Sequence, residues 1–168
     1  DVSGSVIIST VEGTRPMLLE LQALVAPTNF GMARRTSTGV DFNRVALLLA
    51  VLEKRIGLQI QNQDVYINVV GGIKINEPSI DLGIVIAVAS SFRNIPIASD
   101  VVVTGEVGLT GEIRAVSYIE KRIAECKKLG FKKIVIPRNN YEAVKDVKGI
   151  EIIPVDNLRQ AINIVLRG

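Results

Sequence analysis

Two uninterrupted apolar runs, each eight residues long, most strongly constrain the fold of this chain. They extend over residues 45–52 and 82–89. A membrane-spanning helix needs about 20 consecutive apolar residues. Runs of this length therefore predict buried core helices and no membrane partner.

The patterns around these runs predict strands early in the chain and alternating helices and strands later. Residues 5–10 and 18–25 alternate as two strands joined by a turn at 12–16, and a third strand is expected at 65–70. The later expected elements are a helix at 79–92, a strand at 101–104, a small hairpin across 108–111, helices at 116–129, 141–145 and 158–166, and strands at 133–136 and 150–154. This order predicts an α+β fold, an α/β sandwich in which helices pack on a mixed β-sheet.

One long segment, Pro27–Gly39, has no periodic pattern. It contains Arg34 and Arg35 and predicts an exposed loop, a type of segment that is often functional when it is this long. Asp41 follows as the expected cap of a helix that runs to about Arg55.

Length and composition indicate one globular domain, residues 1–168. The hydrophobic content is 48% and the charged content 22%, values typical of folded domains. The chain starts at Asp1, with neither an initiator Met nor a leader pattern, so we expect a fragment of a longer cytoplasmic protein. Cys126 is the only cysteine, which excludes an internal disulfide and fits a reducing cytosol.

The residue types that are missing exclude several kinds of site. The sequence has no histidine, which removes Ser-His-Asp and Cys-His catalysis and ordinary zinc and iron sites. It has no G-x-x-x-x-G-K-[ST] phosphate loop either. We therefore expect no metal and no cofactor in this chain.

The run from Thr104 to Pro137, TGEVGLTGEIRAVSYIEKRIAECKKLGFKKIVIP, resembles the segment of Lon-type proteolytic domains that carries the catalytic lysine. Aligned without a gap, the lysine position of that family falls on Glu120. Lys121 is one residue further on, and a one-residue step turns a helical side chain by about 100°. The resemblance thus implies a peptidase site without its base.

The other half of that site is partly present in the run Glu77-Pro78-Ser79-Ile80-Asp81. Ser79 matches the nucleophile position of the Lon-type pattern. Glu77 and Asp81 replace the flanking glycines, and their charges would oppose an oxyanion. The more ordinary interpretation is that Ser79 caps the helix that follows Pro78.

Further strings refine the resemblance to the carboxy-terminal Lon-protease-like domain of the RadA (Sms) family of bacterial DNA repair proteins. They are VEGTRP at 11–16, LQALV at 21–25, ARRT at 33–36, GVDFNR at 39–44, VVGGIK at 69–74 and EPSIDL at 77–82. The resemblance covers residues 3–166. It implies a Lon proteolytic-domain-like fold that serves as a non-proteolytic scaffold and DNA-contacting ring.

The resemblance also implies properties of a longer parent protein. Members of that family carry a four-cysteine zinc motif and a RecA-like ATPase core, both absent here, so zinc, ATP and magnesium are expected in the missing part. The parent is expected to be an ATP-dependent DNA motor. The implied assembly is a hexameric ring that drives branch migration in homologous recombination, with DNA and RecA-type recombination proteins as partners.

DNA contacts are expected from basic side chains, because the duplex presents a dense row of phosphates. Arg34 and Arg35 in the predicted loop are the first candidates, followed by Arg15, Arg44 and Lys74. Bonds from Arg44 or Arg15 to Asp41 or Glu12 are the structural alternative. A rival set between 121 and 138 comprises Lys121, Arg122, Lys127, Lys128, Lys132, Lys133 and Arg138, for which a solvated surface is the simpler interpretation.

Two hypotheses from different classes follow. The first is a non-enzymatic assembly and DNA-binding module, and the alternative is a Lon-type serine peptidase with a displaced lysine. A lysine ammonium within about 3 Å of the Ser79 hydroxyl would indicate the enzyme.

Overall fold

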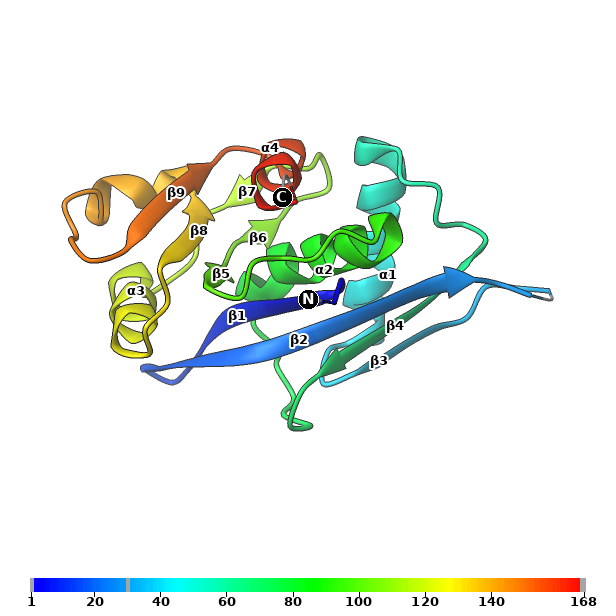
Figure 1. The fold of residues 1–168 in the computed structure, drawn as a ribbon, viewed down its shortest axis with the longest axis horizontal. Coiled ribbons are helices and arrows are strands. Elements are labelled where there is room, and N and C mark those ends of the chain that lie inside the picture. Colours follow the sequence, from blue (N-terminus) through cyan, green and yellow to red (C-terminus); the bar gives the residue numbers. More distant parts are fainter. Residues whose placement is uncertain (1, 30, 167–168) are drawn as a thin grey trace.

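The computed structural model describes residues 2–29 and 31–166. Its main feature is a seven-stranded sheet with the strand order β3-β4-β2-β1-β5-β8-β9 (Figure 1). The strands are β1 (Ser5–Glu12), β2 (Arg15–Pro27), β3 (Arg35–Thr38), β4 (Gln63–Val69), β5 (Val101–Val103), β8 (Lys133–Pro137) and β9 (Glu151–Val155). A separate two-stranded hairpin is formed by β6 (Glu106–Val107) and β7 (Ile113–Arg114).

The sheet is mixed, as the sequence predicted. β2 pairs antiparallel with both β1 and β4. β1, β5, β8 and β9 follow one another in parallel, and β3 lies parallel to β4 at the opposite edge. The expected α/β fold, with helices packed on a mixed sheet, is confirmed.

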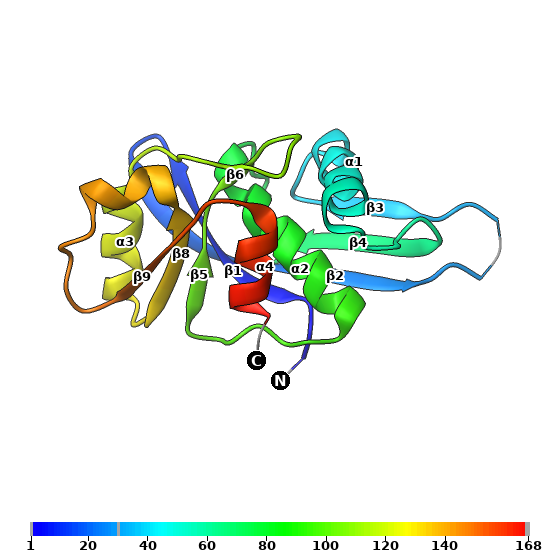
Figure 2. The ribbon, with the colours of Figure 1, turned by 90° about the horizontal axis from the view of Figure 1, so that it is seen from above.

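Helices cover both faces of the sheet (Figures 1 and 2). One face packs on α2 (Asp81–Arg93), with α1 (Phe42–Val51) and α4 (Leu158–Val165) beside it, and α1 continues into a π-helical turn, η1 (Leu52–Ile56). The other face packs on α3 (Ile119–Lys128) and the 3-10 helix η3 (Arg138–Ala143). The second apolar run is therefore the central helix of the larger core.

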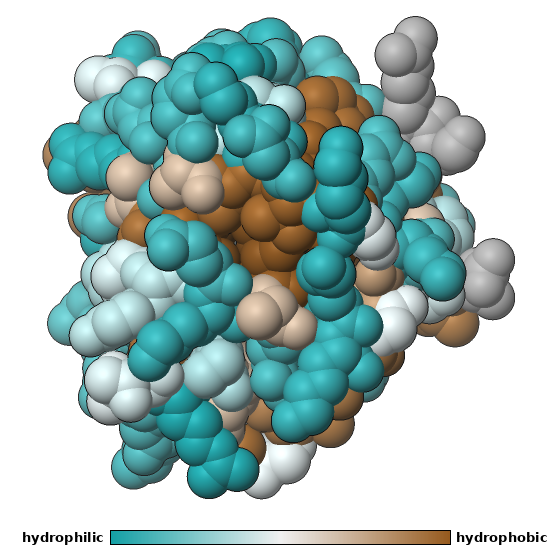
Figure 3. Space-filling model, turned by 90° about the vertical axis from the view of Figure 1, so that its left-hand side faces the viewer, coloured by the Kyte–Doolittle hydropathy of each residue, from teal (hydrophilic) through white to brown (hydrophobic). Residues whose placement is uncertain are grey.

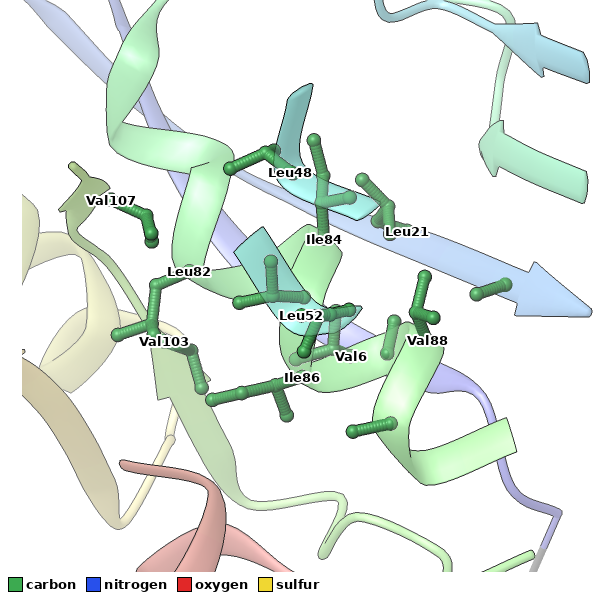
Figure 4. Packing of buried hydrophobic residues seen from close by; sticks show 14 of the residues in the cluster. Val6, Leu21, Leu48, Leu52, Leu82, Ile84, Ile86, Val88, Val103 and Val107 are labelled. Atoms are coloured by element: carbon green, nitrogen blue, oxygen red, sulfur yellow. The ribbon is translucent and has the colours of Figure 1, made fainter. Parts of the chain in front are cut away.

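Helix α2 is enclosed on all sides, since every residue from Asp81 to Ser90 is buried. Figure 4 shows its aliphatic side chains packed among those of α1, β1 and β2. Gly83 lets the helix approach the sheet closely, because a Cβ at this position would lie 2.3 Å from Cγ2 of Ile8. The continuous apolar pattern thus results from burial on every side of the helix.

The prediction that residues 27–39 form an exposed loop is wrong in part. Phe30 lies outside the described residues, but Arg35–Thr38 form the edge strand β3. The Val65 N–H donates to the Arg34 carbonyl at 2.8 Å, which starts the pairing with β4. This pairing spans some thirty positions of sequence, so a local pattern gives no sign of it.

Other boundaries differ by smaller amounts. The helix expected at 141–145 is the 3-10 helix η3, and α3 starts at Ile119 rather than at Val116.

Figure 3 shows the end of the molecule that carries β9, where hydrophilic residues surround a central hydrophobic area. Within residues 2–29 and 31–166, no helix has the length and hydrophobicity to cross a membrane.

Candidate functional site

Ser79 lies in the 3-10 turn Pro78–Ile80 that leads into α2, and it is only 3% exposed. Its hydroxyl donates to the Ser9 carbonyl of β1 at 3.1 Å. The helix begins at Asp81 and its N-cap is Ile80, so the prediction that Ser79 caps this helix is wrong. The groups that such a cap would join have other partners. The Leu82 N–H donates to the Gly105 carbonyl at 3.0 Å, and the Ser79 hydroxyl donates to the Ser9 carbonyl of β1.

Arg122 is the residue that faces Ser79. Its Nη1 donates to Ser79 Oγ at 3.1 Å and to the Ser9 carbonyl at 2.9 Å, and its Nε donates to the Ser117 carbonyl at 2.7 Å. The side chain is 0% exposed, and its Nη2 pairs with Glu77. A guanidinium stays protonated at any physiological pH, so this group supplies hydrogen bonds to Ser79 but cannot accept its proton.

Glu120 occupies a different position from the one that the gapless alignment implied. It is exposed at the start of α3, and a two-residue step along the helix turns it about 200° away from Arg122. Lys121 is also directed elsewhere, since its Nζ donates to the Thr14 carbonyl at 3.2 Å.

Sequence reasoning missed Arg122, although helical periodicity held a signal. The buried positions of α3 are Ile119, Arg122, Ile123 and Cys126, which share one face at the spacing expected of a helix. A cation within an otherwise apolar stripe indicates a buried partner, because an unpaired buried charge is costly.

Glu77 holds Arg122 from the opposite side. Its Oε2 accepts the Val11 N–H at 2.6 Å and the Thr10 hydroxyl at 2.8 Å, while Oε1 pairs with Arg122. Burial alone would raise the pKa of Glu77, but the hydrogen bonds from Val11 and Arg122 outweigh it and the pKa lies below its ordinary value. Glu77 is therefore a charged structural partner.

Asp81 is neutralised in the same way by another arginine. Arg44 Nε donates to Asp81 Oδ1 at 2.9 Å, Arg44 Nη2 pairs with Oδ2, and the Val107 N–H also donates to Oδ2 at 3.1 Å. This hydrogen bond with Asp81 raises the pKa of Arg44. The expectation that Glu77 and Asp81 act as two free negative charges beside Ser79 is wrong, because each carboxylate has a guanidinium partner.

The structure separates the basic residues that the sequence grouped as DNA-binding candidates. Arg15 and Arg34 are exposed but lie near opposite ends of β2. Arg15 is the first residue of this strand, and the Arg34 N–H donates to Asp64, which pairs with Ala26 near the other end. The 13 residues of β2 span about 40 Å. Lys74 is exposed and lines a groove of about 540 Å³ with Glu12 and Gly13 of the β1–β2 hairpin. Arg15 and Lys74 thus lie near the same hairpin, and Arg34 does not.

The other candidates are engaged in the fold. Arg35 lies in β3, donates from Nη2 to the Ile60 carbonyl at 2.8 Å and is 3.8 Å from Glu53. Arg44 bonds Asp81, while Asp41 accepts only its backbone N–H, at 3.2 Å, as the cap of α1. The structural alternative for Arg44 is correct in kind, with Asp81 as the partner instead of Asp41.

The rival basic set does not form one solvated surface. Arg122 is buried, and Arg138 Nε bonds Asp156 at 2.9 Å, whereas Lys127 and Lys128 are exposed on α3.

Burial raises the pKa of the Cys126 thiol, on the buried face of α3, to about 12. In the part of the chain that the structure describes, no group of His, Cys, Asp and Glu side chains is arranged to hold a metal ion.

Comparisons with known proteins give a consistent result. Residues 48–168 match the family model of the Lon protease (S16) C-terminal proteolytic domain. The chain is 55% identical over 166 residues to the DNA repair protein RadA of Bacillus subtilis (strain 168), which covers 99% of this chain and 36% of that protein. It is 51% identical over 160 residues to the DNA repair protein RadA of Listeria monocytogenes serovar 1/2a, which covers 95% of this chain and 35% of that protein. The chain thus spans about a third of the length of these curated relatives.

Proposed function

The chain belongs to the family of Lon protease (S16) C-terminal proteolytic domains. We propose that it is a non-proteolytic, DNA-contacting domain of a RadA-type DNA repair protein. The similarity to RadA that the sequence indicated is confirmed over nearly the whole chain. The observation that carries the proposal is the Arg122 guanidinium 3.1 Å from Ser79 Oγ. Acyl transfer needs a base within reach of the serine, and this neighbour cannot be one.

The buried position of Ser79 also supports a structural role. A nucleophile has to meet its substrate, yet this hydroxyl is 3% exposed and already donates to Ser9. The retained serine and the match to a proteolytic-domain family favour the alternative, a Lon-type peptidase with a displaced lysine. Lys121, the lysine next to the aligned position Glu120, bonds the Thr14 carbonyl.

The wider role of the parent protein is proposed from its relatives. We expect it to act in homologous recombination and branch migration as a hexameric, ATP-dependent DNA motor working with RecA-type proteins. Zinc and Mg-ATP do not fit the residues of this chain, because the printed sequence has one cysteine and no phosphate loop. They are expected in the part of the parent that this chain does not include.

DNA contact is proposed for the end of the molecule that carries the β1–β2 hairpin. Arg15 and Lys74 are exposed there, whereas Arg35 and Arg44 are held by structural bonds. Phosphate contacts of this kind position a duplex without reading its sequence. Arg34, exposed near the other end of β2, is the competing contact.

A binding titration at several salt concentrations tests this proposal. Changing Arg15 and Lys74 together to Ala should weaken binding to unrelated duplexes by similar factors and reduce the salt slope by about one to two units. Arg34→Ala, which removes the competing contact, should leave binding nearly unchanged. If Arg34→Ala weakens binding and the double variant does not, the DNA track lies at the far end of the sheet.

A protease assay tests the rest of the proposal. The wild-type chain should leave an unfolded protein such as casein intact at any pH between about 6 and 9, the range in which a buried amine base would be neutral. Hydrolysis that disappears in Ser79→Ala would establish the alternative.

A further inference from the structure

Tyr118, the residue that precedes α3, is both exposed and held in an unusual conformation. Tyr118 is 46% exposed, although its side chain is large and mainly apolar. Its backbone has φ 57° and ψ 38°, in the left-handed region, which bulky L residues rarely adopt and which Gly and Asn adopt readily. The backbone at this position therefore does not require a tyrosine and would accommodate Asn or Gly with less strain.

The Tyr118 ring is positioned by a cation that also contacts a second element. Lys121 Nζ lies 5.3 Å from the ring centroid, within the range of a cation–π interaction. The same ammonium donates to the Thr14 carbonyl in the turn of the β1–β2 hairpin. The ring, the ammonium and the hairpin turn thus form one surface.

Further cations continue this surface along a groove. Arg15, the residue after Thr14, lines a groove of about 430 Å³ together with Lys128 and Leu129 at the end of α3. Glu125 is the one acidic residue of the same lining. Arg15 and Lys128 in this lining are exposed, so positive charge exceeds negative charge along the groove, and the exposed Lys121 lies one helical turn before Glu125.

We propose that Tyr118 is a stacking site for an unpaired nucleobase, and that Arg15, Lys121 and Lys128 contact the phosphates on either side of that base. This inference rests on the proposed DNA contact and names its ligand class, a single-stranded nucleic acid. An exposed aromatic face beside backbone-neutralising cations is the arrangement that binds single strands without sequence preference. An acidic peptide would use the cations but would gain nothing from the ring.

A substitution that separates stability from binding provides the test. Tyr118→Asn removes the ring and suits the left-handed backbone, so the melting temperature should stay the same or rise. Binding of a (dT) oligonucleotide of about 15 nucleotides should weaken on the order of 10-fold, because stacking contributes this much per base. Tyr118→Phe should bind like the wild type, and Phe42→Asn, which alters a similarly exposed ring (49%) on α1, should also leave binding unchanged.

A fluorescent reporter gives an independent readout that does not depend on folding of the Asn variant. The chain has no Trp, so Tyr118→Trp introduces a single reporter at the site. A base stacked on it should quench its emission on titration with the (dT) oligonucleotide, and an oligo(U) of the same length and free dTMP distinguish DNA, RNA and mononucleotide as sources of the base. A blunt duplex, whose bases are paired, should quench much less.

The outcomes distinguish this inference from the proposed function. If the wild type binds neither duplex nor oligonucleotide, the proposed DNA contact fails and the stacking site fails with it. If the wild type binds the oligonucleotide and Tyr118→Asn binds it equally well, only the stacking site is wrong. Equal quenching by poly-glutamate would also overturn it, in favour of an acidic protein partner.

Discussion

Two ion pairs flank the turn that holds Ser79, and they are built in opposite ways. In the Glu77–Arg122 pair the guanidinium is 0% exposed and the carboxylate is 21% exposed. In the Asp81–Arg44 pair the carboxylate is 0% exposed and the guanidinium is 32% exposed. The same local arrangement thus buries a cation on one side of the turn and an anion on the other.

Because of this difference, only one of the two pairs determines the chemistry at Ser79. The buried cation of the first pair reaches the serine hydroxyl, whereas the buried anion of the second pair accepts from Val107 and Arg44. Arg122 therefore both neutralises Glu77 and fixes the serine. Arg44 closes the other side without contacting Ser79 through any bond that the described residues show.

The largest effect is expected when Glu77 is removed. Glu77→Ala leaves the fully buried Arg122 without its counter-ion, and a guanidinium cannot relieve this by losing its proton. The free energy of unfolding should fall by about 3–5 kcal/mol, as measured by urea denaturation. Glu12→Ala removes an exposed carboxylate at the end of β1, the strand that Glu77 contacts. This variant should change the free energy of unfolding by less than about 0.5 kcal/mol. A comparable loss in both variants would mean that the pair has no special weight.

A smaller loss is expected from the other pair. Arg44→Ala leaves the buried Asp81 carboxylate without its guanidinium, but Asp81 keeps the hydrogen bond from the Val107 N–H and a carboxylate can take up a proton. We expect a loss of about 2–4 kcal/mol. Arg55→Ala, whose Nε bonds an exposed carbonyl at 3.2 Å, is the matched control. If Arg44→Ala costs more than Glu77→Ala, the buried anion Asp81 depends on its partner more than the buried cation Arg122 does.

The pH dependence should show the contribution of Glu77. Its pKa is lowered from 4.5 in the folded state, so the unfolded state binds more protons than the folded state near that pH. The stability from Glu77 is then fully present above about pH 4.5 and is lost as the pH falls through the folded pKa. Glu77→Gln should lose this part of the acid dependence in denaturation curves recorded from pH 3 to 7, and an unchanged slope would contradict the pairing.

The smallest effect is expected at the serine itself. Ser79→Ala removes one hydrogen bond to the Ser9 carbonyl and one from Arg122, which keeps its other partners. The loss should be about 1 kcal/mol, with DNA binding unchanged in the titration described above. A marked loss of binding would assign Ser79 a role beyond packing.

Much of the fold was predictable because it depends on local patterns. The apolar run 82–89 identified the central helix, and the alternation of residues 5–10 and 18–25 identified β1 and β2. The edge strand β3 was not predictable, since four residues with polar side chains (Arg35–Thr38) pair with a strand far along the chain. Local propensity is a weak guide to such non-local pairing.

The site was less predictable than the fold. The motif identifies Ser79, and a gapless alignment places Glu120 at the family's lysine position, but the structure brings Arg122 to the hydroxyl. Long side chains reach across several ångströms, so the residue aligned with a catalytic position need not be the one that faces the site. The pairing of Arg44 with Asp81, 37 positions apart, depends on how α1 packs against α2 and has no sequence signal of its own.

Ser79 faces the Arg122 guanidinium in place of a base, and it is only 3% exposed. Intact-mass spectrometry after incubation with a fluorophosphonate, which reacts with activated serines, tests most directly whether this serine is unreactive. We predict no adduct on the wild-type chain under conditions that fully label a serine peptidase used as a positive control. An adduct that maps to Ser79 and is absent from Ser79→Ala would contradict an unreactive serine and establish an active nucleophile.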